Sequence, residues 1–220
     1  MQYINVFFEY FLLFLIYSFI GWTFEVFLTF VKEHKYINRG FLVGPIVPIW
    51  GTGAIMITLI LKRQDGIFNL VVSSAFIGTA LEYVVNVLME KIFKARWWDY
   101  SHLPFNINGR VWLGSSVLFG IGGACTIYIF NPFFIGILER LSIKVINILG
   151  ILLFFLLVFD LIISCNIIKN LKLSAYSLKK DYTEEVSNKV RSVLKESSRS
   201  FNRLLKAFPD VNFLFKGKKN

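Results

Sequence analysis

Hydrophobic residues along the chain gather into five long stretches that short polar segments separate. A helix that crosses a membrane needs about 20 mostly apolar residues, and each stretch provides that length. The pattern therefore predicts five transmembrane helices, near residues 6–31, 42–61, 67–90, 111–138 and 143–168. Pro132 lies in the fourth stretch and predicts a kink or an early end of that helix. The expected fold class is an all-α membrane protein, with a transmembrane domain over residues 1–168 and a tail over 169–220.

Two of the apolar stretches carry the same residue pattern. Residues 19–25 read F-I-G-W-T-F-E and residues 76–82 read F-I-G-T-A-L-E, so Phe, Ile, Gly and Glu recur at one spacing. The apolar stretch that follows carries W-G-T-G at 50–53 in the first copy and F-G-I-G at 119–122 in the second. We therefore predict two parallel-repeat helical hairpins, about 15–62 and 72–138, plus a fifth helix over 143–168. Membrane proteins built from internal repeats place their binding sites where the repeats meet.

Composition and charge place the chain in a membrane and orient it there. Hydrophobic residues make up 55% of the sequence and the mean hydropathy is +0.60, which excludes an ordinary soluble domain. Residues 32–41, 91–110 and 169–220 hold three, four and thirteen Lys or Arg residues, whereas the two loops on the opposite side hold two each. Because cytoplasmic loops carry the excess of basic residues, we predict an outside N-terminus and a cytoplasmic C-terminus.

The tail combines a strong positive charge with helical periodicity. It contains thirteen basic and five acidic residues. Its apolar residues follow roughly helical spacing until Pro209, namely Val186, Val190, Val193, Leu194, Phe201, Leu204, Leu205 and Phe208. The pattern predicts a basic amphipathic helix that lies on the anionic inner leaflet or mediates self-association into a homo-oligomer. Nucleic acid is not an expected partner, because aromatic residues for base stacking are sparse among the cations.

Three carboxylates lie at similar depth inside predicted membrane helices. Glu25 precedes Lys32 by seven residues and Glu82 precedes Lys91 by nine, which places both acids about 10–13 Å inside the cytoplasmic boundary. Asp160 reaches a similar depth on the fifth helix. An ionised acid at such a position costs about 2.5–3.5 kcal/mol unless it faces the bundle interior and has a partner. We therefore expect a polar chamber that contains all three acids and opens toward the cytoplasm.

Two arginines are the first candidate partners of these acids. Arg39 directly precedes the second predicted helix and Arg110 directly precedes the fourth. With the free N–H groups of both helix N-termini, the two guanidinium groups would form a receptor for a phosphate or carboxylate. Alternatively, Arg39 and Arg110 only neutralise Glu25 and Glu82 as structural ion pairs. The sequence does not choose between the two arrangements.

The second copy contains an insert that is rich in aromatic and charged residues. Arg96, Trp97, Trp98 and Asp99 precede Asn106 in this segment. One interpretation is an aromatic belt that anchors the loop at the membrane interface. The other is a ligand site, in which a tryptophan stacks on the ligand while Arg96 and Asp99 hold its polar end. The density of polar and aromatic side chains favours the ligand site.

Common catalytic and metal-binding motifs are missing from the sequence. The chain contains no G-x-x-x-x-G-K-[ST], H-E-x-x-H or G-x-S-x-G motif. Cys125 and Cys165 fall within predicted spans, where packing is the expected role, and His34 and His102 have no second ligand at metal spacing. We therefore assign no catalytic residue, metal or cofactor, and the sequence favours a protein without enzymatic activity while leaving an enzyme open.

Several motifs resemble those of a known bacterial family. They are G-W-x-x-E at 21–25, N-R-G-F-L-x-G-P at 38–45, L-E-Y at 81–83, R-W-W-D-Y-S at 96–101, N-x-x-G-R at 106–110 and R-L-L-K-A-F-P at 203–209. With these motifs the chain resembles the ABC-transporter type IV permease family (CmpB-like). The resemblance implies a transport subunit of the bacterial plasma membrane that works with a separate ATPase subunit. It implies no substrate and no catalytic residue.

Three functions remain open at this point. The first is a transporter or permease component in which the acids and arginines line a path for a small anionic or lipid-derived ligand. The second is a membrane-embedded enzyme or binder that acts on anionic lipid head groups through Arg39, Arg96 and Arg110, with Glu25, Glu82 or Asp99 as base. The third is a structural or regulatory membrane protein whose ion pairs serve folding alone.

Overall fold

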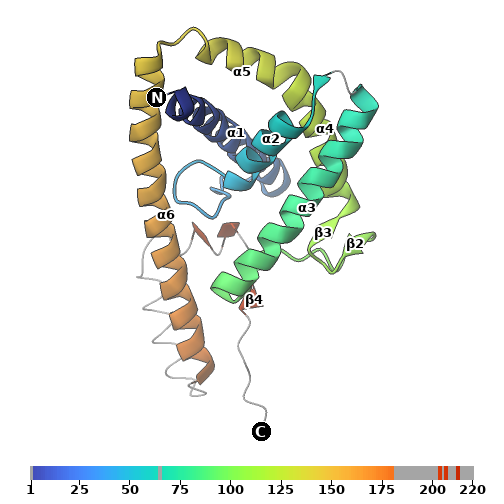
Figure 1. Ribbon diagram of the computed structural model, residues 1–220. Helices are drawn as coiled ribbons and strands as arrows, with labels where there is room; N and C mark the ends of the chain where they lie inside the picture. Colours follow the sequence, from blue (N-terminus) through green and yellow to red (C-terminus); the bar gives the residue numbers. More distant parts are fainter. Residues whose placement is uncertain (1, 64–65, 181–202, 205, 208–211, 214–220) are drawn as a thin grey trace.

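Long α-helices make up most of the protein, as the computed structural model shows (Figure 1). The structure describes residues 2–63, 66–180, 203–204, 206–207 and 212–213. Among these residues, four helical segments are long and apolar enough to cross a membrane: Tyr3–Glu33, Ile67–Phe93, Leu113–Leu138 and Ile143–Lys169. They belong to α1 (Gln2–Glu33), α3 (Ile67–Phe93), the run from α4 to α5, and α6 (Ile143–Lys180). The prediction of a helical, multi-pass membrane protein is confirmed.

The second predicted span is shorter than the hydropathy pattern indicated. In place of a helix over 42–61, the structure has α2 (Pro48–Ile60), which contains 13 residues. At 1.5 Å per residue such a helix is about 20 Å long, whereas the hydrocarbon core of a bilayer is about 30 Å thick. Pro48 occupies the first turn of α2, and residues 41–47 before it, including Pro45, form bends and irregular backbone instead of helix. The apolar stretch is therefore part loop and part helix.

The fourth predicted span changes its helical type near Pro132. It consists of α4 (Leu113–Cys125), a π-helical segment η2 (Thr126–Phe130) and α5 (Asn131–Leu138). Within η2 the Asn131 backbone N–H donates to the Thr126 carbonyl, five residues earlier. Figure 1 shows α5 turned away from the axis of α4. The kink expected at Pro132 thus takes the form of a π-helical turn directly before the proline.

Glycines allow close contact within each of two helix pairs, α1 with α2 and α3 with α4. A Cβ atom added to Gly21 of α1 would lie 2.2 Å from Trp50 of α2. In the other pair, a Cβ atom added to Gly78 of α3 would lie 2.5 Å from Phe119 of α4. Both positions therefore require glycine, because no side chain fits between the helix and the neighbouring aromatic ring.

A single stripe of α3 faces the protein interior at intervals of four residues. Its buried members are Leu70, Ser74, Gly78, Glu82 and Asn86. Residues four apart share one face of a helix, so the stripe carries Glu82 into the bundle and away from lipid. The same interval of four residues separates positions on one face of α1. Four of these positions are buried, namely Leu13, Tyr17, Gly21 and Thr29, and Glu25 lies between Gly21 and Thr29 in the series.

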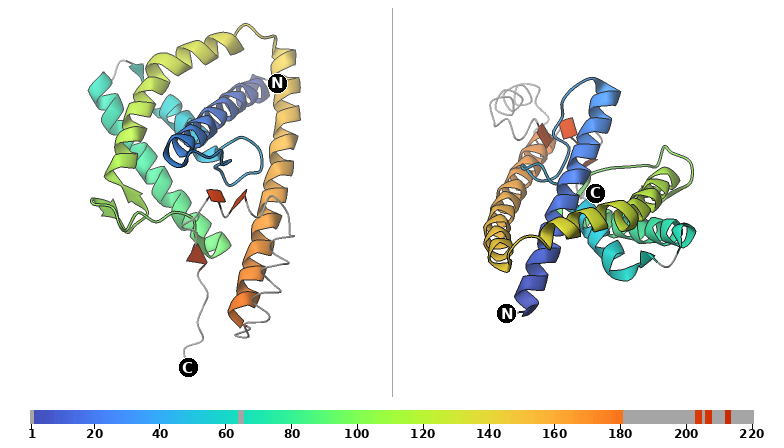
Figure 2. Two further views of the ribbon diagram at one scale, coloured as in Figure 1. Left: turned by 180° about the vertical axis from the view of Figure 1, so that it is seen from behind. Right: turned by 90° about the horizontal axis from the view of Figure 1, so that it is seen from above.

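The bundle has one end that carries most of the loops and charged residues, which we call the polar end. It is where α1 and α3 end and where α2 and α4 begin. Here strand β2 (Asn106–Ile107) pairs with β3 (Val111–Trp112), and β1 (Ala95–Arg96) pairs with β4 (Asn212–Phe213), both antiparallel. In the view from behind, the hairpin of β2 and β3 and the red strand β4 lie at this end of the bundle (Figure 2, left). The β1–β4 pair brings part of the C-terminal segment back to the bundle.

Part of the predicted amphipathic tail can be placed on the protein itself. Leu204 is 1% exposed and packs with Trp97 and Ile168, and Ala207 is fully buried. Leu204, which the sequence pattern assigned to a lipid-facing or self-associating surface, therefore contacts the protein's own core. The other residues on which the predicted tail helix rests lie outside the described residues. They are Val186, Val190, Val193, Leu194, Phe201, Leu205, Phe208 and Pro209.

Candidate functional site

Two carboxylates from different helix pairs approach each other near the polar end. Glu25 of α1 accepts a hydrogen bond at Oε1 from Trp50 Nε1, at 2.8 Å. Glu82 of α3 is 6% exposed and accepts from the Tyr100 hydroxyl at Oε1, at 3.2 Å, and from Ser115 Oγ at Oε2, at 2.9 Å. Trp50, which binds Glu25, lies 6.1 Å from the ring of Phe119, and Phe119 packs against Gly78 one turn before Glu82, so the two carboxylates interact across the contact of the two helix pairs. We call this arrangement the acid pair.

Arg39 is the cation that acts on the acid pair. Its guanidinium interacts electrostatically with Glu25 and Tyr100. Among the described residues, however, Arg39 forms no hydrogen bond and no ion pair within 4 Å. Burial raises the pKa of Tyr100, and the neighbouring Glu82 and Glu25 raise it further, while Arg39 opposes them. Tyr100 therefore stays a neutral hydrogen-bond donor to Glu82.

The other predicted arginines belong to a separate cluster around Glu90. Arg110 lies 2.8 Å from Glu90, and Arg96 lies 3.5 Å from Glu90 and 3.2 Å from Asp99. Glu90 is eight residues beyond Glu82 on α3, a separation of about 12 Å along the helix. Arg110 thus neutralises an acid at the end of α3 and not one of the acid pair. The expected receptor built from two free arginines does not form.

The aromatic insert serves the loop's own structure. Trp97 is 2% exposed and lies in the core cluster beside Ile168 and Leu204. Trp98 Nε1 donates to the Arg110 carbonyl at 3.0 Å. Asn106 fixes the turn that follows it, since its amide donates to the Leu103 carbonyl at 2.7 Å and its oxygen accepts from the Gly109 N–H at 2.9 Å. Trp97 therefore presents no open face for a ligand to stack on, and the Trp98 ring is tied to the loop by its hydrogen bond.

Asp160 forms a third group, apart from the other two acids. Its two carboxylate oxygens accept from the Val43 and Gly44 backbone N–H groups, each at 2.9 Å, and Oδ1 also accepts from Ser164 Oγ at 3.2 Å. The same loop is also held by Arg203, which donates to the carbonyls of residues 40–42. The predicted chamber of three acids therefore separates into the acid pair and this loop anchor.

The position of Arg39 also differs from the sequence prediction. Because α2 begins at Pro48, Arg39 lies in the preceding loop and not at the N-terminus of the helix. Trp22 Nε1 donates to Asn38 Oδ1 at 2.6 Å, and the Asn38 amide donates to the Val43 carbonyl at 3.0 Å. These contacts fix the conformation of the loop that contains Arg39, and the loop in turn places Arg39 beside the acid pair.

Sequence reasoning missed several partners in these groups. Trp50, Tyr100 and Ser115 bind the acid pair, and Glu90 and Arg203 complete the other two clusters. One signal for Glu90 was available, because Glu82, Asn86 and Glu90 repeat every four residues on one helix face. The hydroxyl and indole donors gave no such signal, since Ser, Tyr and Trp are ordinary residues at helix ends and membrane interfaces.

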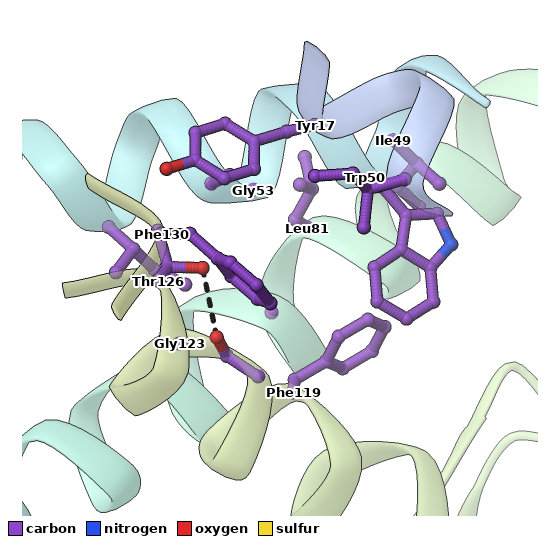
Figure 3. Close-up of a pocket in the computed structure, with 14 residues that line it drawn as sticks. Tyr17, Ile49, Trp50, Gly53, Leu81, Phe119, Gly123, Thr126 and Phe130 are labelled. Carbon is purple, nitrogen blue, oxygen red and sulfur yellow. Dashed lines mark hydrogen bonds between the residues drawn. The ribbon is translucent and has the colours of Figure 1, made fainter. Parts of the chain in front are cut away.

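An apolar cavity of about 90 Å³ lies between the helix pairs, beside the acid pair. All four helices of the two pairs contribute to its walls, and Trp50 is shared between the cavity and Glu25. Figure 3 shows Trp50 and Phe119 at one side of the cavity, with Tyr17 and Phe130 at the opposite side. A water molecule needs about 10–15 Å³ of such space, so the cavity has room for more than a single water.

Comparison with known families agrees with this architecture. The family described as "Putative ABC-transporter type IV" has a model that matches residues 12–165, which include the second and third of the four apolar helices and most of the first and fourth. The chain belongs to this family. No curated protein and no solved structure matches the chain significantly. Family membership therefore gives the transport class, and the described side chains must provide any further detail.

Proposed function

We propose that this chain is the membrane-spanning subunit of an ABC-type transport assembly and that the acid pair, with Arg39, binds its ligand. The observation that carries the proposal is the meeting of Glu25 and Glu82 from two helix pairs. Each acid has neutral hydrogen-bond donors, but neither has an ion pair within 4 Å among the described residues. Acids placed so deep in a membrane protein mark ligand or ion pathways when they face the bundle interior.

The repeated sequence supports a site between two related halves. The F-I-G-x-x-x-E segments contribute Gly21 and Glu25 in one copy and Gly78 and Glu82 in the other. Both glycines contact an aromatic residue of the following helix, and both acids reach the same region. We propose that these pairs are duplicated hairpins and that ligand binding occurs where they meet.

The orientation follows from charge. The polar end carries the loops that are richest in Lys and Arg, so it faces the cytoplasm under the positive-inside rule. In a bacterial plasma membrane the N-terminus is then outside. The acid pair then lies nearer the compartment that contains ATP, where a separate ATPase subunit would contact the polar end. An exposed apolar side chain available for such a contact is Phe105, which is 79% exposed beside β2.

The lipid-head-group enzyme is less well supported by the geometry. That function needs arginines free to bind phosphate, yet Arg96 and Arg110 are paired with Glu90 and Asp99. The remaining cation near the acid pair is Arg39. A site with two carboxylates and one guanidinium favours cationic or zwitterionic ligands over phosphate.

Four variants test the proposed site. Glu25→Gln, Glu82→Gln and Arg39→Ala remove its charges, and Glu33→Gln is the matched control because Glu33 is an exposed acid on the same helix as Glu25. Each is purified in a neutral detergent, and bound small molecules are identified by mass spectrometry. We expect normal yield for all four and loss of a bound molecule in the first three. A uniform collapse of yield in those three, with Glu33→Gln normal, assigns the acids to folding and refutes the proposed site.

The transport assignment has its own test. A tagged chain is purified from its native membranes, and copurifying proteins are examined for ATP hydrolysis. We expect a stoichiometric ATP-hydrolysing subunit whose recovery falls when Phe105 is replaced by Asp, with the exposed Leu59→Asp at the opposite end as control. Recovery of the chain alone under conditions that retain other membrane complexes would contradict a transport assembly.

A further inference from the structure

The cavity between the helix pairs contains unfilled space next to one particular glycine. A Cβ atom added to Gly122 of α4 would meet no atom within 4 Å, although Gly122 lines the cavity. The neighbouring Gly123 is different, because a Cβ atom there would lie 2.2 Å from Ser74 Oγ. Gly123 therefore serves helix packing, whereas Gly122 borders open volume.

The walls of the cavity are hydrocarbon over most of their area. Ile49, Ala54, Ile57, Leu81, Phe119 and Phe130 are among the lining residues. The polar atoms at its edge have partners within the protein, since Tyr17 donates to Asn131 Oδ1 at 2.5 Å and Thr126 donates to the Gly122 carbonyl at 2.9 Å. Such a space favours an apolar occupant over water.

Trp50 joins this apolar space to the acid pair. Its ring lines the cavity and lies 6.1 Å from the Phe119 ring, while its Nε1 donates to Glu25 at 2.8 Å. The Trp50 side chain thus borders the apolar cavity and also binds the Glu25 carboxylate. A molecule with an apolar chain and a polar head, lying across Trp50, would contact both.

The charges beside Trp50 select the sign of that polar head. A bound cation favours the ionised forms of Glu25 and Glu82, which then carry two negative charges beside the one positive charge of Arg39. Arg96 and Arg110 do not change this balance, because Glu90 and Asp99 neutralise them in a cluster of their own. The excess of one negative charge is complementary to one ammonium group.

We propose that the cavity receives the hydrocarbon chain of a cationic amphiphile, a single-chain alkylamine, whose ammonium group binds at Glu25 beside Trp50. This proposal rests on the proposed function and adds the ligand class. The open oxygen of Glu25 supplies the negative partner, because among the described residues Oε2 of Glu25 accepts no hydrogen bond. The adjacent indole adds an electron-rich aromatic face, which also attracts ammonium groups.

The test fills the cavity without touching the acids. Gly122→Leu places a side chain in the open volume, and Gly122→Ala fills part of it. Gly136→Leu is the matched control, because Gly136 also has no neighbour within 4 Å of an added Cβ atom but lies on α5 outside the cavity. The thermal stability of each variant is measured first. The probe is radiolabelled dodecylammonium, with the protein in nanodiscs of neutral lipid and empty nanodiscs subtracted.

We expect saturable binding of one dodecylammonium per chain. Gly122→Leu and Glu25→Gln should each weaken it at least tenfold, Gly122→Ala should weaken it less, and Gly136→Leu and Glu33→Gln should stay within twofold. Dodecyl phosphate and dodecanol, which have the same chain, should bind at least tenfold more weakly. Tighter binding of dodecyl phosphate, or wild-type affinity in a stable Gly122→Leu variant, overturns the proposal.

A short-chain probe separates this proposal from the proposed site. Butylammonium offers the same head group with little chain. If both amines bind in a manner that requires Glu25 while Gly122→Leu has no effect on dodecylammonium, the acid pair stands as a site and the cavity proposal is wrong. If the Glu25→Gln and Glu82→Gln variants bind both amines as the wild type does, the acid pair is not the site and both proposals fall.

Discussion

Replacing Asp160 by Asn tests how the loop before α2 is held. The carboxylate has two acceptor oxygens, which bind the Val43 and Gly44 N–H groups at 2.9 Å each. An amide has one oxygen, so one of these donors must face the NH₂ group or lose its partner. A hydrogen bond to a charged group contributes about 1.5–3 kcal/mol. Because the Val43 N–H also donates to Ser164 Oγ at 3.1 Å and keeps that partner, we expect Asp160→Asn to destabilise the loop by about 2 kcal/mol.

Local opening of this loop can be followed by proteolysis. A change of about 2 kcal/mol raises the open population roughly thirtyfold, and trypsin cleaves after Arg39 in the open form. We expect faster cleavage at Arg39 in Asp160→Asn, with a lower midpoint in a denaturation titration in detergent. Glu139→Gln removes an exposed acid at the other end of the bundle and should behave as the wild type. Unchanged cleavage and an unchanged midpoint in Asp160→Asn would show that the carboxylate does not hold the loop.

Three further changes probe other contacts. Arg203→Ala removes hydrogen bonds to the carbonyls of residues 40–42, so trypsin cleavage of that loop should accelerate; a wild-type rate would contradict the contact. Gly78→Ala places a Cβ atom 2.5 Å from Phe119 and should cost about 1–3 kcal/mol of unfolding free energy in a denaturation titration, whereas a stabilised variant would contradict close packing. The pKa of Asp99 is lowered chiefly by hydrogen bonds from Ser101. Its stabilising effect is therefore present above the ordinary aspartate pKa of about 3.9 and is lost as the pH falls through the lower pKa of the folded state. The protection of the Ser101 amide against exchange, relative to an unfolded peptide at the same pH, should therefore fall only in acid, and a loss of protection at neutral pH would contradict this assignment.

The fold was predictable wherever hydropathy alone decides the structure. Four of the five apolar stretches became long helices, because a run of 20 or more apolar residues has few other ways to satisfy its backbone in a membrane. The segment 42–61 did not, since hydropathy counts residues and takes no account of backbone constraints. Pro45 and Pro48 limit the helix, and Asp160 stabilises the irregular part from more than one hundred residues away in the sequence. Such a contact leaves no local signal.

The site was predictable only as far as its acids. Glu25 and Glu82 stand out because a charge within an apolar helix is costly and because their surroundings are repeated in the sequence. Their partners depend on loop geometry. Arg110 could have reached either Glu82 or Glu90, which share a face of α3, and the turn held by Asn106 and Gly109 places it at Glu90. Spacing along a helix identifies a face, but not which of two acids on that face a loop residue will meet.

The two acids differ in a way that assigns them different tasks. Both oxygens of Glu82 are occupied, by hydroxyl groups of Tyr100 and Ser115. Glu25 has one oxygen bound to Trp50 and the other without a hydrogen bond among the described residues. A carboxylate whose oxygens are both satisfied gains less from a new cation than one with an open oxygen, because the new partner must compete with existing donors. Glu25 is therefore the acid suited to contact a ligand directly, and Glu82 acts on that ligand through its charge.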